Sequence, residues 1–315
     1  MFTLFFTVLL TLAPLFNVLN NQTPRSAQDF NNRGLERQKK GDLDGAIEDY
    51  TTAIGMKAIP AVIATAYNNR ANARLEKDDT AGAIADYSKA IELQGTNFEN
   101  YYNRGVIHLR VNSIDLAIAD FNKAVELQPN LYLIYNSRGN AYSAKKDLES
   151  AISDYSKALS LNPQAIDVLY NRGVAYQNKG KLDEAHTDYT TAISITPEFD
   201  LPYINRAVVR DLKHDLEGAI ADYTKAAELK PGDAGVYYGR GLVRQKKQDL
   251  QGAKADFSKA IELDPALAPA YASRAVMETL LKDQAAADRD FAKAFQLNPS
   301  LKTEYKDFIE KRRKQ

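Results

Sequence analysis

Few side chains in this sequence could carry out chemistry. His108, His186 and His214 are its three histidines, and it contains no cysteine, which excludes disulfides, thiolate metal sites and a cysteine nucleophile. The histidines share no metal-ligand spacing, and the glycines stand singly rather than in a phosphate-binding loop. We therefore expect no metal site, no cofactor and no enzymatic activity.

A repeated charge pair is the most regular feature of the chain. Arginines recur every 34 residues from Arg70 to Arg274, after an earlier one at Arg33, and an aspartate stands 16 residues after each. A functional site needs a special residue in one or two places, whereas the same pair in every unit indicates a structural role. We predict ion pairs that join the helices of one unit or of neighbouring units. The central pairs are Arg104 with Asp120, Arg138 with Asp154, Arg172 with Asp188, and Arg206 with Asp222.

The residues around each arginine repeat as well. After Arg172 come a glycine at 173, alanines at 185 and 192, a tyrosine at 189 and a proline at 197. Apolar residues at three- and four-residue steps predict two helices in each unit, and the proline ends the second helix because it donates no backbone hydrogen bond. One helical hairpin cannot bury its apolar face alone, so neighbouring hairpins must stack.

This pattern resembles the tetratricopeptide repeat family, whose unit has 34 residues. The third unit carries the pattern as Tyr101, Arg104, Gly105, His108, Ala117, Phe121, Ala124 and Pro129. The chain departs from the family in the arginine before each glycine, in the missing proline of its first two units, and in three extra residues near 56–59. The resemblance implies an all-α, right-handed solenoid of eight helix-turn-helix units. The expected units are 27–63, 64–97, 98–131, 132–165, 166–199, 200–233, 234–267 and 268–301.

The two ends of the chain differ from the repeats. Residues 302–315 predict a capping helix with a basic tail, in which Tyr305, Phe308 and Ile309 continue an apolar stripe from Leu301. Residues 2–19 carry no charge and are dominated by Phe, Leu and Val. They predict a signal peptide or N-terminal anchor within 1–26, and hence an exported protein: periplasmic, secreted or attached to the cell envelope. The alternative is an anchored protein whose repeats lie on the cytoplasmic side, which the basic residues after the segment would favour.

The resemblance also implies that the first helices of the units line a concave groove. Asparagines on this face could hydrogen-bond a peptide backbone, because a carboxamide both donates and accepts, and tyrosines could serve as flat anchors. In the alternative interpretation, the tyrosines pack between helices and the asparagines bond neighbouring turns. The predicted ligand-binding residues are Asn68, Asn69, Asn72, Tyr102, Asn103, Asn136, Asn140, Tyr170, Asn171, Asn205 and Tyr238.

These features predict a scaffold or adaptor that binds a peptide or protein partner in the groove. We do not expect a nucleic-acid partner, since 41 basic and 41 acidic residues leave no net charge. We also expect no clamp for the C-terminal carboxylate of a chaperone, because the matching places hold neutral residues such as Asn68, Asn72, Asn103 and Leu133. A glycan- or peptidoglycan-binding protein of the envelope is the alternative, because tyrosines and amides also suit sugars.

Overall fold

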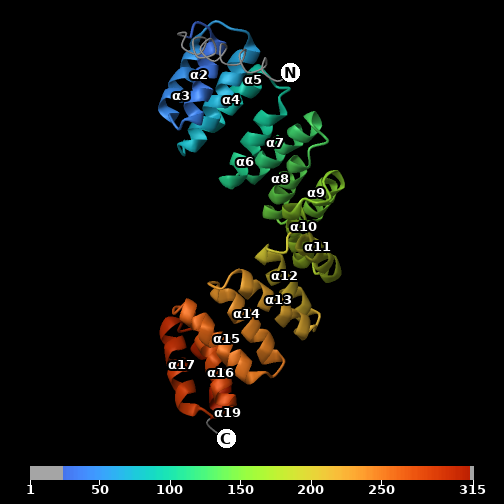
Figure 1. The fold of residues 1–315 in the computed structure, drawn as a ribbon, viewed down its shortest axis with the longest axis vertical. Coiled ribbons are helices and arrows are strands. Elements are labelled where there is room, and N and C mark those ends of the chain that lie inside the picture. The colour runs from blue at the N-terminus through green and yellow to red at the C-terminus, as the bar shows by residue number, and fades with distance from the viewer. Residues whose placement is uncertain (1–23, 313–315) are drawn as a thin grey trace, which may run out of the picture. The chain divides into compact units, whose positions relative to one another are not determined.

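The computed structural model describes residues 24–312, and every regular element in this part of the chain is a helix (Figure 1). Sixteen of the helices form eight consecutive pairs, which we call repeats 1 to 8. Two short helices, α18 (Leu301–Glu304) and α19 (Lys306–Arg312), follow repeat 8. The pairs are α2 (Ala27–Lys39) and α3 (Leu43–Gly55), α4 (Pro60–Glu76) and α5 (Thr80–Leu93), α6 (Phe98–Arg110) and α7 (Ile114–Leu127), α8 (Tyr132–Ala144) and α9 (Leu148–Leu161), α10 (Ile166–Asn178) and α11 (Leu182–Ile195), α12 (Asp200–Leu212) and α13 (Leu216–Leu229), α14 (Ala234–Lys246) and α15 (Leu250–Leu263), and α16 (Ala268–Leu280) and α17 (Gln284–Leu297).

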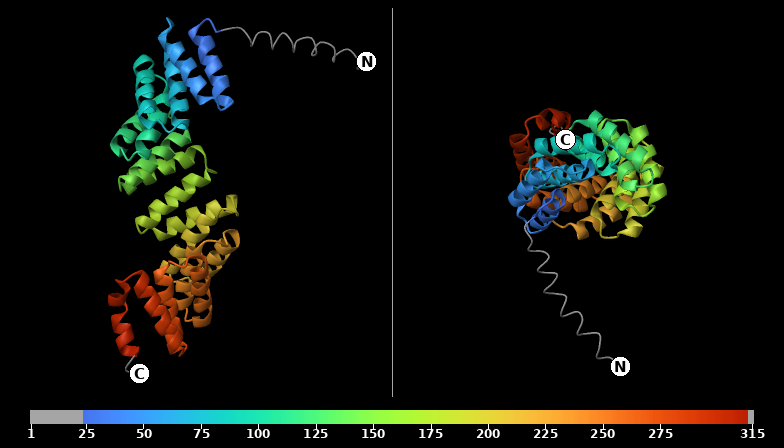
Figure 2. Two further views of the ribbon diagram at one scale, coloured as in Figure 1. Left: turned by 90° about the vertical axis from the view of Figure 1, so that its left-hand side faces the viewer. Right: turned by 90° about the horizontal axis from the view of Figure 1, so that it is seen from above.

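The helices are grouped in two compact units that meet in the turn between α8 and α9. Unit 1 ends at Lys145 and contains α2 to α8, and unit 2 begins at Lys146 and contains α9 to α19. Within each unit, consecutive helices pack against one another, as the two views of Figure 2 also show.

Two predicted features lie outside the described residues. The predicted signal peptide or anchor at residues 2–19 precedes them, and the side chains of the basic tail from Lys311 onward are not described. Among the helices of residues 24–312, none is long and apolar enough to span a bilayer.

The turn inside each repeat depends on one residue with a positive φ angle. Two of these residues are glycines, Gly41 and Gly180, which tolerate this conformation without cost. The other six carry side chains: Asp78, Asn112, Lys146, His214, Gln248 and Lys282. An aspartate then starts the second helix in most repeats, as where Asp215 accepts a hydrogen bond from the Gly218 backbone N–H at 2.9 Å.

A small residue on the first helix allows the second helix to approach closely. A Cβ atom added to Gly173 would lie 2.6 Å from Cε1 of Tyr189, which is closer than non-bonded atoms can come. Tyr189 is fully buried and also packs against Val209 in the first helix of the next repeat. The second helix α11 is therefore packed on both sides by first helices, α10 and α12, which is why these repeats stack.

Two first-helix positions that are buried in other repeats are polar and exposed in repeat 1. In repeats 4, 5 and 7, the two first-helix positions that face the preceding second helix are buried and apolar, such as Ile134 and Ala141. In α2 the same two positions hold Asp29 and Glu36, and both are exposed. Asp29 instead forms a capping box with Ser26 at the start of α2. These two positions of α2 therefore differ from their buried, apolar counterparts in repeats 4, 5 and 7.

At the other end, α18 and α19 cover repeat 8. The rings of Tyr305 and Phe308 lie 5.8 and 6.2 Å from the ring of Phe291 on α17, and Leu301 is buried. The predicted single capping helix is divided at Tyr305, which leaves α-helical geometry (φ −92°, ψ 4°) where its ring packs against Phe291.

The junction between repeats 1 and 2 also differs from the expected one. The predicted boundary between residues 63 and 64 falls inside α4, which begins at Pro60 and has 17 residues, whereas α6 has 13. Proline at the first helical position is pre-set for a helix, so the extra residues lengthen α4 at its start.

Candidate interaction surface

The predicted charge pairs lie between the two helices of one repeat. Arg172 Nε donates to Asp188 Oδ2 at 2.8 Å, and Arg172 Nη2 donates to Asp188 Oδ1 at 2.7 Å. Asp188 is 3% exposed, so the pair is a buried, bidentate contact that holds α10 to α11. The same two bonds join Arg104 to Asp120 and Arg206 to Asp222, at 2.7–2.9 Å.

The two residues of the remaining predicted pair belong to different units. Arg138 belongs to unit 1, where its Nη1 donates to Oδ1 of Asn122 at 2.8 Å. Asp154 belongs to unit 2 and is 6% exposed.

These arginines also make a bond that the sequence reasoning missed. From repeat 2 onward, Nη1 of the arginine donates to a hydroxyl or amide oxygen on the second helix of the preceding repeat. The available signal was a serine, threonine or asparagine 18 residues after each arginine from Arg33 to Arg240. The acceptors are Thr51 for Arg70, Ser88 for Arg104, Asn122 for Arg138, Ser156 for Arg172, Thr190 for Arg206, Thr224 for Arg240 and Ser258 for Arg274.

The first helices of successive repeats also contact one another: α2 with α4, α6 with α8, α10 with α12, and α14 with α16. We call the side on which they meet the first-helix face. The predicted ligand-binding residues all belong to these first helices, and except for Asn136, which is 8% exposed, all of them are half-buried.

In unit 1 the first-helix face carries a network of side-chain amides. Asn69 Nδ2 donates to Asn31 Oδ1 at 2.8 Å, which joins α4 to α2. Asn68 Nδ2 donates to Asn100 Oδ1 at 2.5 Å, which joins α4 to α6. Asn72 Nδ2 donates to Asn68 Oδ1 at 3.3 Å and so extends the network along α4.

The buried hydroxyl of Tyr87 links this network to repeat 3. It donates to Asn72 Oδ1 and is also hydrogen-bonded to Asn103. Burial raises the pKa of Tyr87 to about 12, so the hydroxyl stays protonated and able to donate at neutral pH. Asn72 and Asn103 are therefore brought together from two repeats.

A depression of ≈ 290 Å³ lies beside this network, between α2 and α4. Asn69 and Asn72 form part of its lining, and Gln38 reaches across it from α2 to Glu76 on α4, with Nε2 2.5 Å from Oε1. The complete lining is Leu35, Gln38, Lys39, Asn69, Asn72 and Glu76. It offers amides, a carboxylate and an ammonium group within one small space.

The three predicted tyrosines pack against aromatic rings of the second helices. Tyr102 lies 6.0 Å from Phe121, Tyr170 lies 6.2 Å from Tyr189, and Tyr238 lies 5.8 Å from Phe257, measured between ring centroids. Two of their hydroxyls also bond to the next repeat: Ser137 Oγ donates to Tyr102 at 3.3 Å, and Asn205 Nδ2 donates to Tyr170 at 3.1 Å. The rings thus pack within their own repeats, and the hydroxyls of Tyr102 and Tyr170 join neighbouring repeats. Their contact with a ligand stays a prediction.

The other predicted amides are Asn136, Asn140 and Asn171. Asn136 and Asn140 belong to α8, and Asn171 belongs to α10. Their role in binding also stays a prediction.

The first-helix face changes its chemistry between the two units, which the sequence reasoning did not register. Two of the three amide positions of α4 are taken by apolar residues in α12, where Ile204 and Val208 stand in the places of Asn68 and Asn72, while Asn205 keeps the third. Exposed leucines lie on the same helix: Leu201 is 38% and Leu212 54% exposed. The amide network around Asn68, Asn69 and Asn72 therefore belongs to unit 1.

The histidines lie in unrelated surroundings. His108 is near Asp120, with Nε2 3.8 Å from Oδ2, and burial lowers its pKa. His186 lies on α11, and His214 takes the positive φ angle in the turn of repeat 6. Within residues 24–312 there is no cluster of three or more metal-ligating side chains.

All the family models that match the chain describe tetratricopeptide repeats. Residues 71–112 and 139–180 match the family described as TPR repeat, and residues 99–131, 166–199 and 234–267 match families described as tetratricopeptide repeat. No curated protein matches the chain.

Solved structures of such repeats resemble the chain. The MamA protein is 26% identical, with a TM-score of 0.51, over 55% of this chain and 94% of MamA. YrrB, described as a TPR protein with an unusual peptide-binding site, is 23% identical with a TM-score of 0.52, over 58% of this chain and 95% of YrrB. A tetratricopeptide repeat protein from Parabacteroides merdae is 19% identical with a TM-score of 0.59, over 81% and 99%.

Proposed function

The chain belongs to the tetratricopeptide repeat family, and we propose that it is a non-enzymatic scaffold that binds an extended peptide segment of a partner protein on the first-helix face of unit 1. Tetratricopeptide repeats are protein-interaction modules, which supports the general role. The proposed location of the site rests on the amide network of repeats 1 and 2.

The observation that carries this proposal is the row formed by Asn68, Asn69 and Asn72 beside the ≈ 290 Å³ depression. An extended peptide presents backbone N–H and C=O groups in alternation, and carboxamides can pair with both. Each asparagine also has a second N–H, beyond the one in the bonds described above. The bonds between repeats hold the amides in place before a peptide arrives, which lowers the entropy cost of binding.

Selection from random peptides displayed on phage, with the immobilised full-length protein as bait, tests the proposal. We expect selected peptides to bind the purified protein in solution, and a soluble peptidoglycan fragment not to displace them. If no peptide is enriched while the protein is retained on a peptidoglycan column, the glycan-binding alternative replaces this proposal.

We further propose that the protein is exported or attached to the cell envelope through residues 2–19. Their uncharged, apolar sequence supports this location. Protease protection in intact spheroplasts tests the location. Digestion of the repeats by protease added outside is expected, whereas an intact, uncleaved chain would place them on the cytoplasmic side.

A further inference from the structure

Four of the eight repeats hold a second arginine, four residues after the first, in the groove between their two helices. In repeat 2, Arg74 Nη1 donates to Asp86 Oδ2 at 2.8 Å and to the Gly82 carbonyl oxygen at 3.1 Å. Arg37, Arg210 and Arg244 contact the corresponding aspartate and glycine carbonyl in repeats 1, 6 and 7. In these four repeats the groove therefore already holds a guanidinium group, which comes from the chain's own second arginine.

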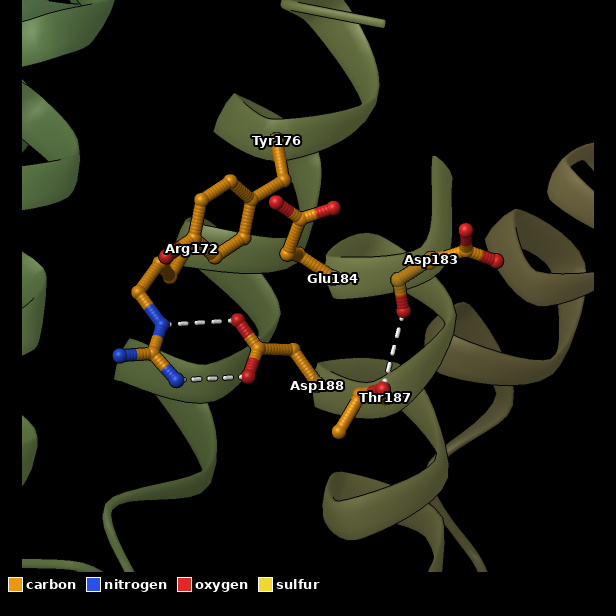
Figure 3. A pocket seen from close by; sticks show the side chains of 6 residues that line it. All are labelled: Arg172, Tyr176, Asp183, Glu184, Thr187 and Asp188. Carbon is orange, nitrogen blue, oxygen red and sulfur yellow. Dashed lines mark hydrogen bonds and ion pairs between the residues drawn. The ribbon is translucent and has the colours of Figure 1, made fainter. Parts of the chain in front are cut away.

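Repeat 5 has the same groove without the second arginine. Tyr176 stands in the place of the arginine, and Glu184 stands in the place of the glycine. A depression of ≈ 260 Å³ lies there, and Figure 3 shows Tyr176 and Glu184 beside the pair formed by Arg172 and Asp188. The depression is lined by Arg172, Tyr176, Asp183, Glu184, Thr187 and Asp188.

The buried carboxylate of repeat 5 has fewer donors than its counterpart in repeat 2. Asp86 Oδ2 accepts from Arg70 Nε and from Arg74 Nη1. Among the described residues, Asp188 Oδ2 accepts only from Arg172 Nε, although a carboxylate oxygen can accept two bonds. One acceptor position is thus left on a carboxylate that is 3% exposed.

The rest of the lining also suits a planar cation. The ring of Tyr176 already has cations over it, with Arg172 Cζ at 5.6 Å and Lys181 Nζ at 5.8 Å from its centroid. Asp183 is paired with Lys213, and Glu184 Oε1 lies 3.5 Å from Lys181 Nζ. These surface pairs contribute little stability, so a bound guanidinium can compete for either carboxylate.

We propose that the groove between α10 and α11 is a second binding site, which accepts the side chain of an arginine from a partner protein. The guanidinium would donate to Asp188 Oδ2 and lie beside Tyr176 and Glu184, as the chain's own second arginine lies against the aspartate in repeats 2, 6 and 7. The site is separate from the first-helix face and does not depend on the function proposed for that face.

Titration with N-acetyl-arginine amide, followed through the backbone amide signals of residues 172–188 by NMR on the full-length protein, tests this site. The matched variant is Y176R/E184G, which gives repeat 5 the residues of repeats 2, 6 and 7 and should therefore fold. It should weaken binding by roughly tenfold or more, because its own arginine takes up the bonds to Asp188. The reverse variant, R210Y/G218E, should create a second site in repeat 6.

The expected result is a saturable shift of signals around Tyr176 and Glu184 with the arginine probe, and none with the citrulline analogue, which has the same shape without the charge. Equal shifts with N-acetyl-lysine amide would contradict a guanidinium site. An unchanged affinity in Y176R/E184G, or no shift at all in the wild-type protein, would overturn the proposal.

Discussion

Arg206 on α12 donates from Nη1 to Oγ1 of Thr190 on α11 at 3.0 Å, while its other nitrogens hold Asp222 within its own repeat. One guanidinium thus closes a hairpin and joins it to the preceding one. The arginine that interrupts the family pattern before each glycine therefore has a structural explanation. It couples neighbouring repeats through a polar contact between side chains.

Repeats with and without a second arginine should respond differently to loss of the first arginine. Arg172→Ala leaves Asp188 buried without a cation, which typically costs about 3–5 kcal/mol of unfolding free energy. Arg206→Ala should cost less, about 1–3 kcal/mol, because Arg210 still lies 2.9 Å from Asp222. Urea unfolding of both variants measures the difference, and equal losses would show that the second arginine does not compensate.

The turns within the repeats offer a second test. Gln248 has φ 64°, a conformation that favours glycine, so Gln248→Gly should raise the unfolding free energy by up to about 1 kcal/mol. Gly180 has φ 77° at the same place in repeat 5, and Gly180→Ala should lower it by about 1 kcal/mol. Thermal unfolding measures both changes, and a shift of the same sign in the two variants would contradict this role of the turn.

Glu278 predicts a dependence of stability on pH. It is 5% exposed and stands where four other repeats hold the second arginine; Lys254 Nζ lies 3.4 Å from Oε1, and among the described residues Oε2 has no hydrogen-bond partner. Burial, and then the nearby charge of Asp290, raise the pKa of Glu278 above its usual value. Because the pKa of Glu278 is higher in the folded than in the unfolded chain, the protonated form favours folding and the ionised form opposes it. The free energy of unfolding therefore falls as the pH rises through the pKa of the folded state.

Glu278→Gln should therefore be more stable than the wild-type protein at pH 7, and the difference should disappear near pH 4. Melting temperatures measured across this range check the sign. Glu262→Gln is the matched control, since Glu262 is exposed and pairs with Lys259 on the surface. A lower melting temperature of Glu278→Gln at pH 7 would mean that its pairing with Lys254 outweighs the cost of burial.

The sequence allowed the helical pairs to be predicted because the same packing contact recurs in every unit. The ring of Tyr189 packs directly against the backbone of Gly173. A small residue and an aromatic residue therefore recur at this spacing in every unit. The start of α4 at Pro60 could not be predicted in this way, because the extra residues there belong to no repeated position.

Much of the candidate surface depends on geometry that the repeat pattern does not contain. Which oxygen accepts from Asn68 or Asn69 depends on side-chain conformations on neighbouring helices, which spacing alone does not determine. The second arginine was visible in the sequence, since Arg210 is followed eight residues later by Gly218, as Arg74 is by Gly82. The sequence does not show that Arg74 and Arg210 each share a buried aspartate with the first arginine of their repeat, because that contact depends on how the two helices pack.

The most direct test of the proposed binding face is the affinity of a selected peptide for the variant N69S/N72V. Serine and valine occupy these same positions in other repeats, as at Ser137 and Val106, so the variant should keep its fold, with a melting temperature lowered by the loss of the bonds to Asn31 and Tyr87. Asn130→Ala, which changes an exposed loop asparagine, is the matched control. Fluorescence anisotropy should show binding weakened by roughly tenfold or more in N69S/N72V and unchanged in the control, since the lost amides would have paired with the peptide backbone. Equal affinity of the folded variant and the wild-type protein would contradict the account.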